Sequence, residues 1–254
     1  MITVQDIFDT LCRLAPLDLQ LDFDNSGFLV GHPDKEVSRV LLTLDITEPV
    51  VDEAIAKGVQ LIISHHPLIW DPLKSITSSG EGARVLRLIE HQIAAICMHT
   101  NLDIANGGVN DVLMQKLGGE VEGPLDKDGC GRIGHLAGQI SLEEFLLDCK
   151  RILKANGLRF IDSGRPVYKL AVMGGAGSHA IEDAFLAGCD TYVTSDIKYH
   201  QFQQAQDLGL NLIDADHFCT ENPIIPVLAD RLRADYPEIS FIVSEVHNQL
   251  IQFI

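Results

Sequence analysis

The sequence predicts an α/β fold of two related halves, each with a mostly parallel sheet flanked by helices. Short apolar runs of strand length alternate with helical patterns, which is typical of parallel sheets covered by helices. A helix–glycine–strand pattern at residues 52–64 also recurs without gaps at residues 182–194. A second pair of matching segments, 109–117 and 224–232, follows in the same order. Two matches in one order predict an internal repeat.

The first half shows the alternation most clearly. Residues 40–44 form an apolar run that we expect to be a buried strand, and a helical pattern begins near Glu48. Gly58 is expected to end this helix, because glycine readily adopts the left-handed conformation found after many helices. The remaining elements of this half are a strand at 61–63, a helix at 83–89 and a strand at 93–98.

The halves are expected to join within the Gly- and Asp-rich stretch from Gly118 to Gly134, because glycine and proline punctuate it densely. We therefore place the first half at residues 1–124 and the second at 125–254, with the two halves free to interlink. A second Gly-rich segment, 174–178, follows an apolar run and precedes a helical pattern. It could bind an anion, but a tight strand-to-helix turn is the favoured interpretation.

Composition narrows the class of protein. The chain has 254 residues, is 46% hydrophobic and carries a net charge of −17. These values predict a globular protein that binds neither nucleic acid nor an anionic membrane surface, both of which favour clustered Lys and Arg. The six cysteines are scattered, no signal peptide is visible and no apolar run reaches membrane-spanning length. We therefore expect a cytoplasmic protein without disulfides.

Histidines and carboxylates gather in three segments: 64–67, 99–103 and 217–221. Each follows an apolar run that we expect to be a buried strand. Imidazole and carboxylate together suit a divalent metal such as zinc, manganese, iron or nickel. Five side chains exceed what one tetrahedral ion takes from protein, so the pattern predicts two ions and hydrolytic chemistry. The candidate ligands are His65, His66, Asp103, His217 and Glu221.

These ligands divide between the halves, three in the first and two in the second. In open parallel sheets, molecules and ions bind beyond the carboxyl ends of the strands, and all three segments are expected at such ends. We therefore expect the metal site in the cleft between the halves. His99 is a candidate for proton transfer. It could instead bind a metal ion directly or orient one of the metal ligands. Asp45 ends a neighbouring strand and is expected to orient a ligand histidine.

Each segment also has a structural interpretation. Adjacent histidines on a regular strand point to opposite faces, so one of His65 and His66 could be buried and the other exposed. Pro67 favours an extended conformation before it and allows both to turn toward a site. Asp103 could form a turn. Glu221 is expected in a loop just before a helix, with Asn222 as its N-cap and Pro223 as its first helical position, where it could interact with the helix dipole.

Taken together, the segments resemble the GTP cyclohydrolase 1 type 2 homolog family, also called the NIF-three-like proteins. The similarity spans essentially the whole chain and rests on the segments 24–27, 64–68, 99–103, 193–200 and 217–221. It implies two linked α/β halves, a dinuclear metal centre and a ring-shaped homohexamer. The implied ligands are the same five residues. Ser195 and Asp196 depart from a Gly-Glu pair at that position, so the roles of these two residues and of His200 stay open.

The resemblance implies opening of the guanine ring of GTP by water, with loss of formate. Our functional hypothesis is broader: a metal-dependent hydrolase of a nucleotide or similar small phosphorylated compound. The metals would supply the positive charge that so acidic a chain lacks. The alternative is a non-catalytic metal-binding scaffold, metallochaperone or regulatory protein, because fold and site do not fix the substrate.

Overall fold

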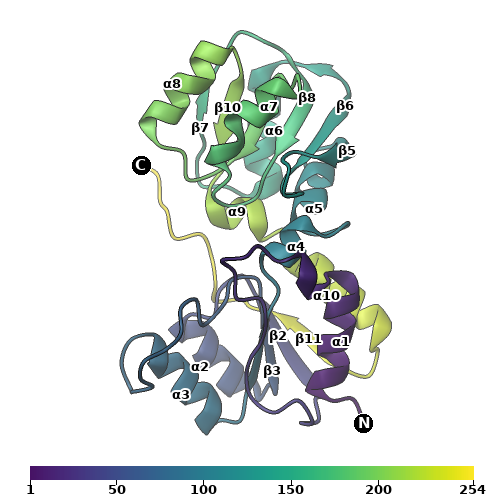
Figure 1. The fold of residues 1–254 in the computed structure, drawn as a ribbon, viewed down its shortest axis with the longest axis vertical. Helices are drawn as coiled ribbons and strands as arrows, with labels where there is room; N and C mark the ends of the chain where they lie inside the picture. Colours follow the sequence, from purple (N-terminus) through teal and green to yellow (C-terminus); the bar gives the residue numbers. More distant parts are fainter. The chain divides into compact units, whose positions relative to one another are not determined.

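A computed structural model describes residues 1–254, with Glu81 described by its backbone alone. The chain divides into two compact units. Unit 1 contains Met1–Asn106 and Ile225–Asn248, and unit 2 contains Gly107–Ile224 and Gln249–Ile254. Each unit has a sheet of its own with helices packed against it (Figure 1). Within the described residues, no helix combines the length and apolar character that crossing a membrane requires.

The sheet of unit 1 is mostly parallel. Its strand order is β1-β4-β3-β2-β11, and β1 is the antiparallel member, paired with β4. The strands are β1 (Gly27–Val30), β2 (Arg39–Thr43), β3 (Leu61–Ser64), β4 (Ala94–Cys97) and β11 (Ser240–Val243). The helices are α1 (Val4–Leu14), η1 (Leu17–Leu19), α2 (Glu48–Lys57), α3 (Glu81–Glu90), α4 (Thr100–Ile104) and α10 (Ile224–Asp235).

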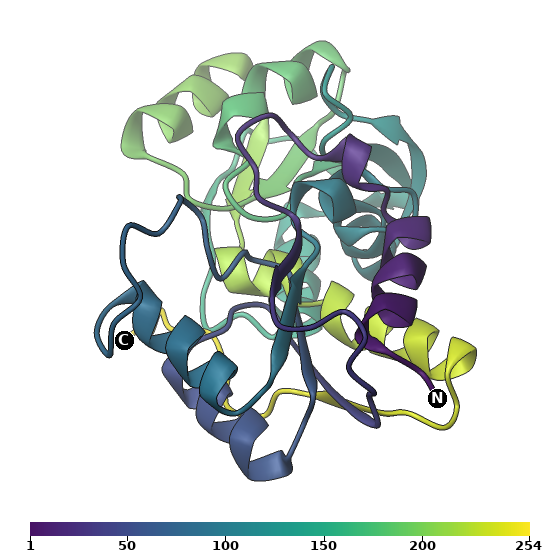
Figure 2. The same ribbon diagram turned by 60° about the horizontal axis from the view of Figure 1, so that its bottom comes forward.

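Helices cover both faces of this sheet. In Figures 1 and 2, α2 and α3 lie on one face, and α1 and α10 lie on the other. The apolar sides of α2 and α3 pack on the sheet, where Val50, Ala54 and Leu88 form one core with Leu41 and Ile62. The strands are therefore buried on both faces, and their carboxyl ends are left to carry polar side chains.

The sheet of unit 2 is mixed, with a parallel centre. Its strand order is β5-β6-β8-β9-β10-β7; β8, β9 and β10 are parallel, and the outer pairings are antiparallel. The strands are β5 (Gly119–Pro124), β6 (Arg132–Ile140), β7 (Arg159–Ile161), β8 (Val167–Val172), β9 (Thr191–Thr194) and β10 (Asn211–Asp214). The helices are α5 (Val109–Lys116), α6 (Leu142–Leu153), η2 (Ser178–Ala180), α7 (Ile181–Leu186), α8 (Tyr199–Leu208) and α9 (His217–Glu221).

The predicted α/β class is confirmed. The two copies of the sequence repeat also form the same kinds of element in the same order. Residues 52–64 cover α2 and β3, and residues 182–194 cover α7 and β9. The order β4, α4, α5 likewise corresponds to β10, α9, α10. The third element of each series belongs to the other unit, because α5 lies in unit 2 and α10 lies almost entirely in unit 1. The chain therefore passes between the units more than once.

The predicted linker from Gly118 to Gly134 is wrong. This stretch contains β5 and the start of β6, which pair as an antiparallel hairpin in unit 2. The structural division accordingly falls at residue 106, ahead of our sequence boundary at 124. The glycines serve close strand packing: a Cβ at Gly134 would collide with the backbone of Glu120 on the paired strand. Glycine density marked a tight hairpin here, not a flexible connection.

Candidate metal centre

Three histidines gather at the carboxyl ends of β3 and β4 in unit 1. His65 and His66 follow β3, and His99 follows β4 at the start of α4. One ring nitrogen from each lies within 4.8 Å of the others, so the three could hold a metal ion together. The rings of His65 and His66 are 5.0 Å apart between centroids. Both adjacent histidines therefore join one group, because β3 has ended before them at Ser64.

In each of these histidines an oxygen acceptor lies at hydrogen-bonding distance from Nδ1. The carbonyl oxygen of Met98 is 2.8 Å from Nδ1 of His65, which is buried. A carboxylate oxygen of Asp45 is 2.7 Å from Nδ1 of His66, and one of Asp24 is 2.7 Å from Nδ1 of His99. Such a contact fixes the tautomer with the proton on Nδ1 and leaves Nε2 as the basic nitrogen.

Asp24 is a buried carboxylate that holds several groups at once. Besides His99, it accepts hydrogen bonds from the hydroxyls of Ser26 and Thr100 and from the Thr100 backbone. Burial raises the pKa of Asp24, but the hydrogen bonds from His99, Thr100 and Ser26 outweigh it and hold the pKa well below its usual range. In the sequence, segment 24–27 contributed to the family resemblance without a role for Asp24. Its side chain positions His99.

Asp45 lies between two histidines. Its second carboxylate oxygen is 2.7 Å from Nε2 of His247, and its first is 2.7 Å from Nδ1 of His66. Burial raises the pKa of Asp45, but hydrogen bonds from His247 and His66 lower it by more, so it stays ionised. The structure thus brings the predicted orienting residue to His66. His247 was missed, because it stands in the C-terminal segment without any motif.

Asp103 belongs to the same region through α4. One of its carboxylate oxygens lies 3.6 Å from Nε2 of His65. The sequence left a turn as the structural interpretation, and the structure places Asp103 in the short helix α4, four residues after His99. This contact joins the predicted ligands His65 and Asp103 within unit 1.

In unit 2, His217 and Glu221 begin and end the short helix α9. The i,i+4 spacing puts them on one helix face, with Nε2 of His217 3.0 Å from a carboxylate oxygen of Glu221. Nδ1 of His217 lies 2.8 Å from Asp196, whose backbone has a positive φ of 55°. The expected loop position of Glu221 is wrong: it is the last residue of α9, because Asp216 caps a helix that starts at His217.

The Gly-rich turn after β8 packs against this pair. Gly175 has a φ of +64°, and a Cβ there would overlap a carboxylate oxygen of Glu221 and lie 3.1 Å from Nε2 of His217. Its N–H donates to the hydroxyl of Thr220 on α9 at 3.0 Å. The expected strand-to-helix turn is present, and its second glycine leaves the space that the two candidate ligands occupy.

The three residues whose roles stayed open lie in different surroundings. Ser195 is fully buried and its hydroxyl donates to the carbonyl of Gly175. Asp196 orients His217. Its position just after the strand β9, at the carboxyl edge of the sheet, could have suggested such a role. His200 is exposed near the start of α8. Among the described residues, it does not belong to any cluster of side chains that could hold a metal ion.

The donor set and its spacing fit divalent metal ions. Two ligand atoms that share a first-row cation at about 2.1 Å from each stand roughly 3 to 3.5 Å apart. The separations of 3.6 Å for His65–Asp103 and 3.0 Å for His217–Glu221 are close to this range. Imidazole nitrogen with carboxylate oxygen is also a donor set that zinc, manganese, iron and nickel accept.

Fold and side-chain clusters define a two-unit α/β protein whose histidine and glutamate groups could bind metal. Residues 2–249 match the sequence profile of the Duf34/NIF3 family, described as NGG1p interacting factor 3. The chain belongs to this family, in agreement with the resemblance seen in its sequence.

Relatives support this assignment over the whole length. The chain is 32% identical to a protein of Clostridium perfringens named GTP cyclohydrolase 1 type 2 homolog, covering 99% of each chain. It is 38% identical to a Nostoc protein of the same name, covering 78% of this chain and 79% of that one. The crystal structure of a Staphylococcus aureus hypothetical protein, SA1388, is 30% identical, with a TM-score of 0.91 over 99% of both chains.

Proposed function

We propose that the protein is a dinuclear metal-dependent hydrolase acting on a nucleotide or a similar small phosphorylated compound. The ligands would be His65, His66 and Asp103 from unit 1 with His217 and Glu221 from unit 2. The metal would be zinc, manganese, iron or nickel, since the donor set accepts each of them. Activity on GTP is a special case, suggested by the name that the relatives carry.

One observation carries the proposal most strongly. His65, His66, His99 and His217 each have an oxygen acceptor at Nδ1, supplied from within their own unit. This arrangement is characteristic of histidines that bind metal through Nε2, because the acceptor fixes the tautomer and the orientation of the ring. Structural histidines need no such uniform arrangement. His135 has a similar contact with Glu122 in the β5–β6 hairpin. The proposal therefore rests on the position of the other four, at two strand ends and in a short helix, next to carboxylates that could also bind metal.

The chemistry divides between metals and protein groups. Bound divalent metals would acidify a water molecule and neutralise charge on the attacked centre and on phosphate oxygens. Among the protein groups, His99 is the proposed proton donor and acceptor, at Nε2. Asp24 keeps the proton of the neutral ring on Nδ1, so that Nε2 is free to accept one. Since His99 also lies with His65 and His66, direct ligation is the competing role for the same nitrogen.

The test measures metal content and turnover in the same preparations. Protein purified without chelator and reconstituted with each metal is assayed for metal per chain and for hydrolysis of a panel of nucleotides. We expect two ions per chain and turnover that Glu221→Ala abolishes. The control is Glu182→Ala, an exposed glutamate on α7 in the same unit, which should retain both.

The other outcomes separate the alternatives. Two ions per chain without turnover of any nucleotide would favour the metal-binding scaffold or metallochaperone. Fewer than one ion per chain under metal-replete conditions would refute both functions. The cytoplasmic location and the homohexamer stay predictions from the sequence; sedimentation equilibrium showing a mass near 27.9 kDa would refute the hexamer.

A further inference from the structure

We infer that Phe23 and Trp70 form a stacking surface for a planar heteroaromatic ring next to His99. The inference rests on the proposed function in one respect: it names the part of the substrate that this surface would hold. It assigns two residues that are neither candidate ligands nor in hydrogen-bond contact with them, and it can be tested on metal-free protein.

The two side chains form an exposed aromatic pair in unit 1. Phe23 is 64% exposed and Trp70 is 45% exposed. Their ring centroids are 6.2 Å apart with an interplanar angle of 35°, which is a direct contact. The Trp70 ring also meets His99 edge to face, with centroids 5.5 Å apart. A ring lying on this pair would therefore be next to the imidazole proposed to transfer protons.

The loops that carry the pair are fastened to each other and to the site. The side-chain amide of Asn25, two residues after Phe23, donates to the carbonyl of Ile69, next to Trp70, at 2.6 Å. Asp24, next to Phe23, holds His99. The exposed rings are thus presented from anchored backbone, which lowers the entropy lost when a ligand binds.

A planar ring is the ligand that this surface fits best. Large aromatic side chains exposed in contact with each other leave apolar faces in water, and a nucleobase-like ring covers such faces by stacking. The exposed carboxylates are Asp22, which precedes Phe23, and Asp71, which follows Trp70, and their negative charge disfavours binding through phosphate alone. Recognition would begin with the ring. A nucleoside and a nucleotide share this chemistry, and the experiment distinguishes them.

The chain offers a direct probe, because Trp70 is its single tryptophan. We would titrate metal-free protein with guanosine and with ribose 5-phosphate and follow Trp70 fluorescence. We expect saturable quenching by guanosine and none by ribose 5-phosphate. GTP should bind more weakly than guanosine without metal and gain affinity when manganese is added, since the added ion offsets the charge of the phosphates.

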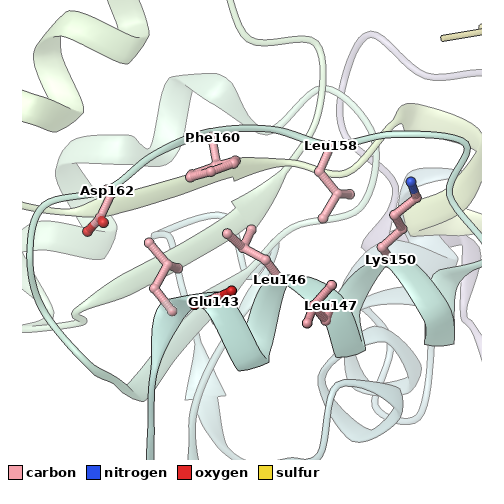
Figure 3. A pocket seen from close by; sticks show the side chains of 8 residues that line it. Glu143, Leu146, Leu147, Lys150, Leu158, Phe160 and Asp162 are labelled. Carbon is pink, nitrogen blue, oxygen red and sulfur yellow. The ribbon is translucent and has the colours of Figure 1, made fainter. Parts of the chain in front are cut away.

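Variants locate the effect. Phe23→Ala should weaken guanosine binding at least about five-fold, the lower end expected for loss of one stacking contact. Calorimetry should show a loss of similar size for Trp70→Ala and near-normal binding for Trp70→Phe. The matched control is Phe160→Ala: this phenylalanine is 48% exposed on β7 in unit 2, over a groove that Leu146 and Leu158 also line (Figure 3), and guanosine binding should be unchanged.

The inference fails if guanosine leaves Trp70 fluorescence unchanged, or if Phe23→Ala binds it as the wild type does. It fails as well if the fluorescence responds to protein concentration and not to guanosine, because the pair would then be a contact between copies of the chain. Guanosine binding without hydrolysis of any nucleotide would uphold the stacking surface and refute the hydrolase. Hydrolysis of a nucleotide with kcat/KM unchanged in Phe23→Ala would uphold the hydrolase and refute the stacking surface.

Discussion

The two units hold their candidate ligands by different means. In unit 1, Asp24 and Asp45 each contact more than one group, and both have pKa values that hydrogen bonds hold below the usual range. In unit 2, the side chain of Asp196, which orients His217, is 51% exposed, and His217 and Glu221 pack against the backbone of Gly175. Buried or shared carboxylates position His66 and His99 of the first set, whereas close packing against a glycine backbone is the main constraint on the second. The two sets should therefore respond to different substitutions.

The largest effect is expected from Gly175→Ala. The new Cβ would overlap Glu221, and the left-handed backbone adds a strain of about 1 to 2 kcal/mol. We expect metal binding that depends on His217 and Glu221 to weaken by about 100-fold or more. Isothermal titration calorimetry with manganese measures this change in affinity.

The control for this variant is Gly164→Ala. Gly164 has a φ of +76° and nothing within 4 Å of the added Cβ, so it carries the backbone strain without the overlap. The Gly164→Ala protein should be less stable than the wild type but should bind metal with normal affinity. Equal loss of metal affinity in both variants would contradict backbone packing as the means of positioning the pair.

The second comparison replaces one orienting carboxylate in each unit. Asp45→Asn should lower metal affinity by about 10- to 100-fold, because it removes the negative acceptor that orients His66. Asp196→Asn should lower it by about ten-fold or less, since that carboxylate is half exposed and solvent screens it. Asp52→Asn, on the exposed side of α2, is the neutral control. A larger loss for Asp196→Asn would reverse the comparison between the units.

A smaller effect is expected from His247→Gln. This change removes one of the two histidines that contact Asp45 and keeps a hydrogen-bond donor at the site. We expect metal affinity to fall a few-fold, corresponding to roughly 1 kcal/mol for a weakened hydrogen bond. His247→Ala should fall further. Identical affinities for both variants and the wild type would show that Asp45 orients His66 without His247.

The smallest effect on metal affinity is expected from a change in the segment that brings His247 to Asp45, where the main effect is on stability. Glu53 accepts hydrogen bonds from Lys57, from the Ser244 hydroxyl and from the Glu245 backbone. Burial raises the pKa of Glu53, but these hydrogen bonds, first that of Lys57, lower it by more. Its stabilising effect is therefore present above the unfolded value of about 4.3 and disappears as the pH falls through the lower folded value.

Glu53→Gln should accordingly reduce the free energy of unfolding by about 1 to 2 kcal/mol at neutral pH. It should also lessen the loss of stability that the wild type shows below about pH 4.3. Urea unfolding across that pH range measures both effects. A wild-type and a variant curve that stay parallel through the acid range would show that this carboxylate does not keep a lowered pKa.

Much of the fold and of the candidate site follows from local sequence. The apolar runs that became β2, β3 and β4 and the helix–glycine–strand repeat are local patterns, and parallel strands put their carboxyl ends at one edge. Histidine segments placed after such strands could therefore be expected near one another. The contact of His65 with Asp103 agrees with that reasoning.

What the sequence did not predict depends on contacts between distant segments. Asp45 meets His247 across 202 positions, and Asp24 meets His99 across 75, with no local pattern to signal either pair. The role of Gly175 arises from the approach of α9, which a Gly-rich turn alone does not indicate. The hairpin of β5 and β6 was mistaken for a linker for the same reason: its pairing partner was not visible in its composition.

The most direct test of the account is the number of metal ions bound per chain when one unit's ligands are removed. Metal-replete wild-type protein, His65→Ala and His217→Ala would be freed of loosely held metal and analysed by mass spectrometry for elements. Our account predicts two ions per wild-type chain and a loss in each variant, because both units supply ligands. Fewer than one ion in the wild type, or an unchanged content in both variants, would contradict it.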